Sequence, residues 1–269
     1  MPNQVFIFLA FVCFAFLLPA ERGLDAAQYP TLDVQYARVA PHLDAGLNDP
    51  AWDSAVAIPH LSLSLGDTSD LTALPTEVRL LWDEHFLYIR FICTGTDIYV
   101  PYRGHDQPHY KGDVVEVFLD PVGDAREYVE IELTPKNDTF DQVILITAPQ
   151  VKSDSQGVLL KEVQERDFWA FPQWDLAGLR TAAKICVLPS GEQGWIAELA
   201  IPANPLLQRL GRTTFMAMTM HANLLRYEWR KSGSDSGAAR QLIPMNWAPV
   251  RNGSPHLSPE AMGLLRLVK

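Results

Sequence analysis

Hydrophobic and polar residues alternate along most of the chain from residue 32 onward, and helical periodicity is scarce. Successive side chains of a strand face opposite sides, so alternation over about four to eight residues indicates a strand with one buried face. The clearest segments are residues 61–65, 76–93, 113–120, 127–135, 140–148, 181–189, 194–202, 213–229 and 263–269. Within 76–93, two apolar runs flank the polar turn Asp83-Glu84-His85, which predicts a β-hairpin.

Turn residues separate these segments at short intervals, and prolines stand at strand ends, as in LTP, VLP and AIP. Short strands interrupted by Pro and Gly are typical of a β-sandwich. Two segments break the rhythm. We expect one short helix within 149–178 and a long Gly-, Ser- and Pro-rich loop over 230–261. The pattern therefore predicts an all-β, antiparallel β-sandwich with long loops, forming one domain over residues 27–269.

The first 26 residues differ from the rest of the chain. Residues 5–18, VFIFLAFVCFAFLL, are an uncharged apolar run of 14 residues followed by small residues. A membrane span needs about 20 apolar residues, so this run is more typical of a secretory signal peptide, although no Lys or Arg precedes it. We predict a signal peptide over residues 1–26 and a secreted or periplasmic protein. An uncleaved membrane anchor is the alternative.

The net charge of the 269-residue chain is −10, and no run of basic residues is present. Such a chain repels phosphate backbones, so nucleic acid is not expected as a partner. After removal of the signal peptide, two cysteines remain, Cys93 and Cys186. An exported protein can join them in a disulfide, and two free thiols are the alternative. There is no Cys/His cluster, so a zinc site is not indicated.

An unusual feature of segment 113–120 is a carboxylate in the middle of an apolar strand. If this segment pairs with 127–135 through the turn PVGDAR, one sheet face carries four polar side chains: Glu116, Tyr128, Glu130 and Glu132. Val114 and Phe118 share that face, which favours a half-enclosed cleft, and a solvated outer face is the alternative.

Clustered carboxylates suit three kinds of site. They can form a glycosidase acid/base pair, hold calcium, or accept hydrogen bonds from sugar hydroxyls. Segment 213–229 adds an amide and a counter-charge for the acidic face, Asn223 and Arg226. In the late loop, Trp247 and His256 are candidates for stacking on a ligand, and Trp247 is equally suited to filling the core.

Five blocks resemble family 9 carbohydrate-binding modules, in the same order along the chain. They are DAGLNDPAWDSA (44–55), VRLLWDEHFLYIRF (78–91), DVVEVFLDP (113–121), GWIAELAIP (194–202) and HLSPEAMGLLRL (256–267). The resemblance implies a DOMON-like, jelly-roll-like β-sandwich that is secreted and binds a saccharide or a polysaccharide end without cleaving it. It also implies a setting in polysaccharide degradation, with any activity on O-glycosyl bonds belonging to an associated glycoside hydrolase.

The resemblance places the two aromatic residues that clamp a sugar ring on Tyr110 and on or near His256, with Glu116 as the motif's glutamate. Both clamp residues are Trp in well-known sugar binders, and Glu130 stands where an Arg-type side chain is expected. Calcium also occurs in the family, and Asp44, Asp49 and Asp53 are possible oxygen donors.

Two other functions stay open. Related sandwiches bind haem b for electron transfer, and the segment FMAMTMH contains Met216, Met218, Met220 and His221 as possible axial ligands. Methionines at every second position also suit a buried strand face. The third hypothesis is a glycoside hydrolase that uses Glu116 and Glu130. A small sandwich provides no deep cleft to raise the pKa of an acid catalyst, so binding is preferred.

Overall fold

The computed structural model describes residues 29–63, 71–147, 150–153, 159–163, 167–233, 239–251 and 253–269. The predicted signal peptide, residues 1–26, lies outside them. The strands are β1 (Thr31–Tyr36), β2 (Val56–Ile58), β3 (Ser62–Leu63), β4 (Thr76–Trp82), β5 (Phe86–Thr94), β6 (Val114–Asp120), β7 (Glu127–Leu133), β8 (Thr139–Ile146), β9 (Gln150–Ser153), β10 (Leu159–Val163), β11 (Phe168–Phe171), β12 (Arg180–Val187), β13 (Gln193–Pro202), β14 (Met218–Lys231), β15 (Arg240–Asn246) and β16 (Gly263–Val268).

The short helices are α1 (Ala203–Leu206) and the 3-10 turns η2 (Pro50–Ser54), η3 (His109–Lys111), η4 (Gln208–Leu210), η5 (Pro255–Leu257) and η6 (Pro259–Ala261). None of the described helices is long and apolar enough to cross a membrane.

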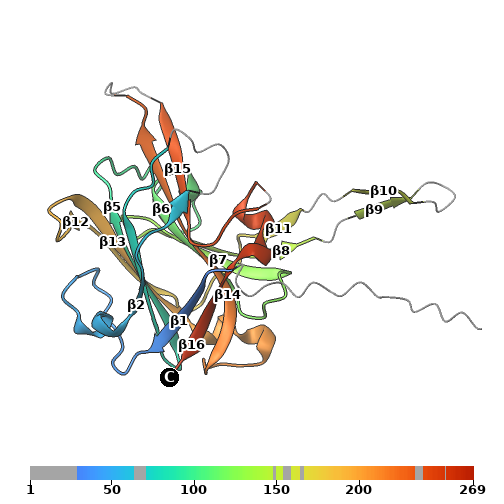
Figure 1. Cartoon of the computed structure of the whole chain (residues 1–269), viewed down its shortest axis with the longest axis horizontal. Helices are drawn as coiled ribbons and strands as arrows, with labels where there is room; N and C mark the ends of the chain where they lie inside the picture. The colour runs from blue at the N-terminus through green and yellow to red at the C-terminus, as the bar shows by residue number, and fades with distance from the viewer. Residues whose placement is uncertain are drawn as a thin grey trace, which may run out of the picture.

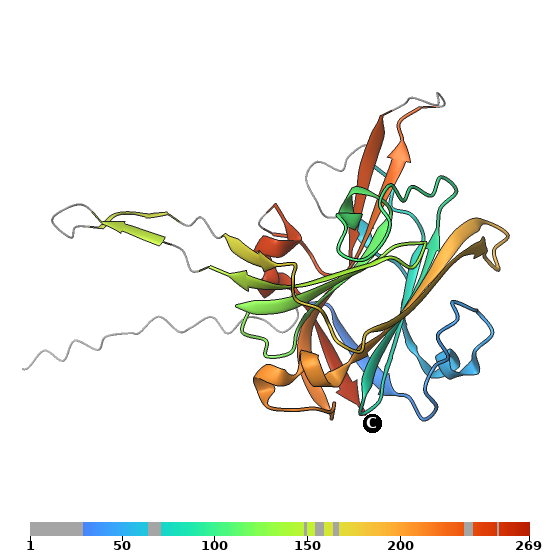
Figure 2. The ribbon, with the colours of Figure 1, turned by 180° about the vertical axis from the view of Figure 1, so that it is seen from behind.

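The fold is a curled sheet whose two halves face each other as a sandwich. The strand order is β11-β8-β7-β6-β14-β16-β1-β4-β5-β13-β12, with β15 on β14 and β3, and β2 on β4. One layer consists of β8, β7, β6 and β14, the other of β4, β5, β13 and β12, and β16 and β1 connect them at one edge (Figures 1 and 2). The predicted all-β sandwich is thereby confirmed.

Alternation along the strands builds the core between the layers. Val115, Val117 and Leu119 of β6 point inward, and Phe91 of β5 and Trp195 of β13 meet them from the opposite layer. All five side chains are fully buried, because period-two alternation places every second residue on the inner face. The inner face of each strand therefore supplies the apolar area that stabilises the sandwich.

Three details of the predicted architecture are wrong. The strand β1 runs parallel to both β16 and β4, so the sheet is mixed rather than antiparallel. The described parts of 149–178 include strands β9, β10 and β11, whereas the α-helical turn α1 follows β13. Residues 240–246, inside the predicted loop 230–261, form strand β15 along β14. Pairing with a neighbouring strand stabilises segments whose local sequence signals are weak.

The two cysteines are free and lie on opposite faces of the sheet. Cys93 is opposite Trp195 in the sheet register, and Cys186 is opposite Gly194, the neighbouring residue of β13. Because adjacent residues of a strand face opposite sides, Cys93 is in the core and Cys186 is on the outer face. Of the two alternatives for this pair, the structure thus shows two free thiols and not a disulfide.

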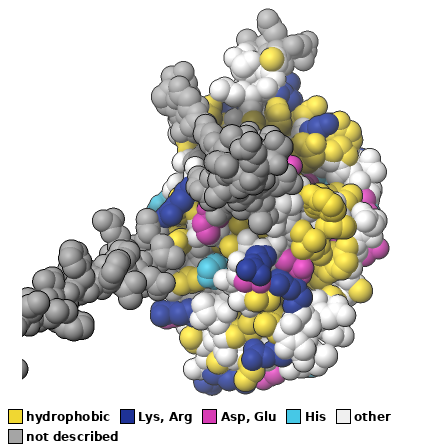
Figure 3. Space-filling model, turned by 90° about the vertical axis from the view of Figure 1, so that its right-hand side faces the viewer, with side chains coloured by type: hydrophobic (Ala, Val, Ile, Leu, Met, Phe, Trp, Pro, Cys, Tyr) yellow, Lys and Arg dark blue, Asp and Glu magenta, His cyan; other side chains and the backbone are white. Residues whose placement is uncertain are grey.

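The outer surface carries both signs of charge. On the face shown in Figure 3, Lys and Arg side chains lie beside Asp and Glu side chains instead of gathering in one large patch. Arg209 illustrates this pattern, since it contacts Asp124 at 2.9 Å and Glu127 at 3.5 Å. Exposed pairs of this kind contribute little to stability.

Candidate functional site

The hairpin of β6 and β7 brings the predicted acidic side chains together. Its register pairs Glu116 with Glu132 and Phe118 with Glu130, and β14 continues the same face with Leu225. The carboxylates of Glu116, Glu130 and Glu132, here called the glutamate trio, each offer an oxygen within 4.8 Å of the others. The shared acidic face predicted from alternation is therefore present, and it is buried rather than solvated.

The trio opens into a cavity of about 430 Å³, here called the acidic pocket. The residues that line it are Asp106, Gln107, Pro108, Tyr110, Glu116, Glu130, Glu132, Phe140, Gln142, Tyr227 and His256. Four of its side chains are aromatic rings, and the trio contributes the acidic wall. Concave sites with apolar walls and a few convergent polar groups are typical of small-ligand binding.

Burial controls the ionisation of the trio. Loss of hydration raises the pKa of Glu130 to about 7, although the Gln142 Nε2 donates a hydrogen bond to its Oε2 at 2.5 Å and favours the charged form. Burial and then repulsion from Glu130 raise the pKa of Glu116 well above its usual range. Burial also raises the pKa of Glu132. Burial therefore favours the protonated form of Glu116 and Glu132 at neutral pH, and Glu130 can adopt either form.

The ring of His256 closes one side of the pocket and is held in place by stacking. It lies 5.2 Å from the ring of Phe118 and 4.8 Å from that of Phe168, and its Nδ1 is 2.7 Å from the hydroxyl of Tyr128. Burial lowers the pKa of His256 to about 4, so the ring is neutral at pH 7. The pocket therefore has a fixed, neutral ring on this side.

Tyr110 provides an exposed aromatic surface on the pocket. It lies in η3, whose position is fixed by the Trp229 indole, which donates a hydrogen bond to the Tyr110 carbonyl at 2.9 Å. The Asp113 carboxylate accepts bonds from the backbone N–H groups of Tyr99 and Trp229 at 2.7 and 2.8 Å. The Tyr110 side chain is 46% exposed, which leaves it accessible for stacking.

The pocket is not lined by three of the predicted site residues, Tyr128, Asn223 and Trp247. Tyr128 is buried beneath it and bonds to His256. Asn223 uses its amide to hold the backbone of Ala248, at 3.3 Å to the carbonyl and 2.9 Å from the N–H. Trp247 packs on the core and covers Gly263, where an added Cβ would lie only 2.6 Å from its ring. Of the two alternatives for Trp247, the structure thus shows core packing.

The prediction that Arg226 is the counter-charge of the acidic face is wrong. Arg226 is opposite Val115 in the register, so its side chain points to the inner face of the sheet. There it is fully buried and forms an ion pair with Glu228 at 2.6 Å and a hydrogen bond to the Thr76 hydroxyl at 2.9 Å. The sequence-based assignment was wrong because the face of Arg226 depends on which β6 residue lies opposite it, and this register is not readable from the segment alone.

Sequence reasoning also missed several pocket residues. Gln142 and Phe140 belong to β8, which extends the acidic face beyond β7, with Glu130 opposite Gln142 and Glu132 opposite Phe140. Tyr227 lies on β14, one position beyond Arg226 and therefore on the outer face. Counting alternate positions along β8 and β14 was the signal that would have found all three.

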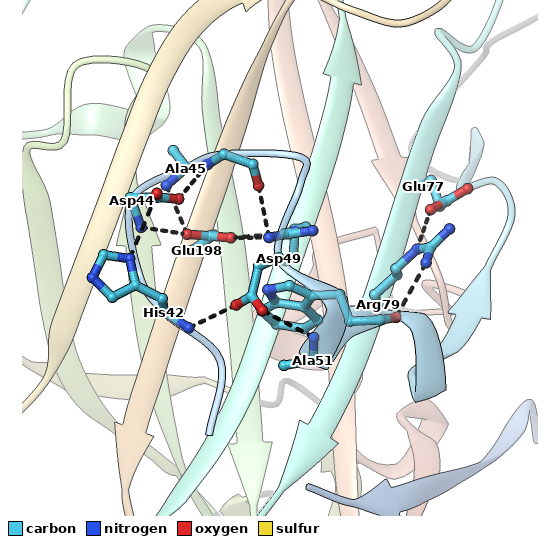
Figure 4. Close-up of polar contacts among 11 residues, drawn as sticks. His42, Asp44, Ala45, Asp49, Ala51, Glu77, Arg79 and Glu198 are labelled. Atoms are coloured by element: carbon cyan, nitrogen blue, oxygen red, sulfur yellow. Dashed lines mark hydrogen bonds and ion pairs between the residues drawn. The ribbon is translucent and has the colours of Figure 1, made fainter. Parts of the chain in front are cut away.

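The loop that contains the first motif block forms a separate polar network (Figure 4). Glu198 of β13 pairs with Arg90 of β5 at 2.6 Å and accepts hydrogen bonds from the N–H groups of Asp44 and Ala45 at 3.0 and 2.7 Å. Burial raises the pKa of Glu198, and Arg90 opposes that shift. The ring of Trp52 lies 4.5 Å from the Arg90 guanidinium. The motif residues here serve to fasten the loop to the sheet.

The oxygen donors predicted for calcium have protein partners in this loop. Asp49 caps η2, because its two oxygens accept hydrogen bonds from the N–H groups of Ala51 at 2.9 Å and His42 at 2.7 Å. Asp44 accepts from the Gly46 N–H at 2.7 Å. Calcium binding by Asp44, Asp49 and Asp53 stays a prediction.

A second cavity of about 530 Å³ lies beside the same loop and is lined by Arg79, Arg90 and Glu77, among others. Both arginines are already paired, Arg79 with Glu77 at 2.5 Å and Arg90 with Glu198. The basic groups of this cavity are therefore already paired within the protein.

The residues considered for haem do not converge. Met220 is buried in the core and Met218 packs against it, whereas Met216 precedes β14 and is 52% exposed. His221 follows Met220 and so points to the opposite face. For the hydrolase hypothesis, Glu116 and Glu130 lie on adjacent strands of one wall, whereas a glycosidase pair flanks its substrate.

Comparison with known proteins agrees with the predicted family for part of the chain. Residues 43–156 match the family model described as Carbohydrate family 9 binding domain-like. A search of curated proteins found no match.

Solved structures resemble the whole fold. A proposed carbohydrate-binding protein from Bacteroides uniformis ATCC 8492 has a TM-score of 0.63 and 14% identity, over 89% of this chain and all of that one. A family 9 module from Caldicellulosiruptor kristjanssonii in complex with cellotriose has a TM-score of 0.57 and 17% identity, over 88% and 93%. A family 9 module from the same organism in complex with glucose has a TM-score of 0.57 and 18% identity, over 88% of this chain and 95% of that one. The chain thus has the fold of family 9 carbohydrate-binding modules, and residues 43–156 match that family's sequence pattern.

Proposed function

We propose that the chain is a non-catalytic carbohydrate-binding protein, a family 9-type module of the DOMON-like group, whose acidic pocket holds one end of a saccharide. The observation that carries this proposal is the combination of ring faces and hydrogen-bonding groups in one cavity of about 430 Å³. Rings of Tyr110 and His256 line the cavity together with the glutamate trio. Sugars present both apolar ring faces and hydroxyl groups, so this combination suits them.

Protonation lets the carboxyls of the trio donate hydrogen bonds to sugar hydroxyls as well as accept them. A protonated carboxyl donates one hydrogen bond and still accepts others, whereas a carboxylate only accepts. Because burial raises the pKa of Glu130 to about 7, this side chain can adopt either form near neutral pH. The match of residues 43–156 and the sugar complexes of the structural relatives support the same function. The apolar run of residues 5–18 supports secretion, and export suits a role in polysaccharide degradation.

The test is affinity electrophoresis against soluble polysaccharides combined with a glycan array. We expect Tyr110→Ala to abolish retention while the melting temperature stays unchanged, because this side chain is 46% exposed and contributes little to the core. Trp169→Ala is the matched control, since Trp169 is an exposed aromatic residue of β11 that does not line the pocket. Equal loss in both variants, or retention by no glycan, would contradict the proposal.

A further inference from the structure

The acidic pocket is lined by acidic groups that have no basic partner among its described lining residues. Four of its lining residues are acidic, and none of the described residues that line it is Lys or Arg. His256 Nδ1 lies 3.9 Å from Oε2 of Glu130, but burial lowers the pKa of this ring to about 4, so it is neutral at pH 7. Arg226 does not compensate either, because it lies on the inner face of the sheet and pairs with Glu228. A buried acidic group without a protein counter-charge is costly unless a ligand supplies one.

One carboxylate oxygen of Glu132 has no hydrogen-bond partner in the part of the chain that the structure describes. Glu132 is 2% exposed, and its Oε2 is buried and makes no hydrogen bond with the described residues. The Glu132 carboxyl does have the backbone of Tyr110 as a hydrogen-bond partner, and Glu130 has the Gln142 amide as a donor. Native proteins seldom leave a buried carboxylate oxygen unpaired, and an open acceptor on the wall of a cavity indicates a donor brought by the ligand.

The geometry of the trio matches an ammonium group. A primary ammonium has three N–H donors, and the trio offers three carboxylates with oxygens within 4.8 Å of one another. The rings of Tyr110 and Tyr227 line the same cavity, and aromatic faces attract cations, as Lys111 Nζ shows at 5.6 Å from the Tyr110 ring centre. Calcium takes about six to eight oxygen ligands, and much of the remaining lining is ring surface, as at Tyr110 and Phe140. The cavity of about 430 Å³ also exceeds what a bare ion fills.

We propose that the acidic pocket selects a saccharide that carries a protonated primary amine, with the amine bonded to Glu116, Glu130 and Glu132 and a sugar ring stacked on Tyr110. This inference rests on the proposed carbohydrate-binding function and names the class of sugar, an unacetylated amino sugar. The unpaired Oε2 of Glu132 accepts one of the three ammonium hydrogens.

Binding of a cation changes the protonation of the trio. A nearby positive charge lowers the pKa of each carboxyl, so a glutamate that burial keeps protonated ionises when the ligand binds. Each such ionisation releases one proton to the solvent, and the ammonium keeps its own three hydrogens. The charged and titratable groups that line the pocket are Glu116 of β6, Glu130 and Glu132 of β7, Tyr227 of β14, His256 of η5, Tyr110 of η3 and Asp106 of the preceding loop.

Three trisaccharides with one backbone test the inference. They are the β-1,4-linked trimer of glucosamine, its fully N-acetylated form, and cellotriose, which differ only in carrying an ammonium, an amide or a hydroxyl at C2. Isothermal titration calorimetry at neutral pH measures affinity, and two buffers of different ionisation enthalpy measure released protons. We expect the glucosamine trimer to bind about tenfold more tightly than the other two, with proton release, because charged hydrogen bonds exceed neutral ones.

The variant Glu132→Gln distinguishes the contribution of the amine to binding from that of the rest of the sugar. It removes the unpaired acceptor, and we expect it to abolish the preference for the amine while weaker binding persists. Glu127→Gln is the matched control, because Glu127 is on the same strand, outside the pocket, and contacts Arg209. We expect it to keep the preference.

The possible outcomes distinguish this inference from the proposed function. Equal affinity for cellotriose and the glucosamine trimer would overturn the inference and leave the proposed function intact. A preference that survives in Glu132→Gln would also overturn it. Binding of no trisaccharide would overturn both. Calcium chloride is titrated alone as a further test. Calcium binding that depends on Glu132 would assign the trio to a metal site and overturn the inference that it binds an amine.

Discussion

Replacing Glu130 by Gln tests the central physical claim, that the glutamate trio is buried at a cost in stability. Burial raises the pKa of Glu130 from 4.5 to about 7 in the folded protein. An acid with a raised pKa stabilises the fold fully below its unfolded pKa, and this stabilisation is lost as the pH rises through the folded pKa. The pH window is therefore about 4.5 to 7. Gln has no proton to lose, so the variant does not show this loss.

The magnitude follows from the shift. One pKa unit corresponds to about 1.4 kcal/mol, so a rise from 4.5 to about 7 corresponds to roughly 3 kcal/mol for this fully buried group. The amide introduced by Glu130→Gln keeps an oxygen that accepts the bond from Gln142. The substitution also removes the repulsion that raises the pKa of Glu116. We expect Glu130→Gln to match the wild type at pH 4.5 and to be more stable by roughly 3 kcal/mol at pH 8.

Urea unfolding of the ligand-free protein at several pH values between 4.5 and 8 measures the difference. Glu127→Gln is the control, because Glu127 lies on the same strand but is partly exposed, and we expect its pH dependence to follow the wild type. If wild type and Glu130→Gln lose stability in parallel as the pH rises, Glu130 is ionised at no cost and the reasoning is wrong. A variant that is less stable at pH 8 would refute it as well.

Three further substitutions test the supporting structure. Arg226→Met leaves Glu228 buried and unpaired, so we expect a loss of about 3–5 kcal/mol in urea unfolding that is partly recovered by adding Glu228→Met; no recovery would contradict the ion pair. Gly263→Ala places a Cβ 2.6 Å from the ring of Trp247 and 2.8 Å from the Pro30 carbonyl oxygen, and we expect a loss of roughly 1–3 kcal/mol in the free energy of unfolding that Trp247→Phe restores only in part. Asp49→Ala removes the cap of η2, and we expect a loss of about 0.5–2 kcal/mol without change in saccharide binding; altered binding would connect this loop to the pocket.

The sequence was a good guide to the acidic face because local alternation and hairpin pairing determine it. Glu116, Glu130 and Glu132 share a face in any register that joins β6 to β7 through the turn at 121–126 and keeps the apolar residues inside. Arg226 could not be assigned in the same way, since its face depends on how β14 pairs with β6 across the 97 residues, from 121 to 217, that separate the two strands.

The sequence by itself determined that the chain forms strands, that these pack as a sandwich, and that acidic side chains gather on one hairpin, because the period-two pattern depends only on neighbouring residues. Only the tertiary structure decided that the glutamate trio is buried and that Tyr110, Tyr227 and His256 enclose it. The same is true of the parallel strand β1 and of β15, which form by pairing with distant segments. Burial, and with it the raised pKa values of the trio, is a property of elements that meet in space, and alternation along one strand carries no information about what covers its outer face.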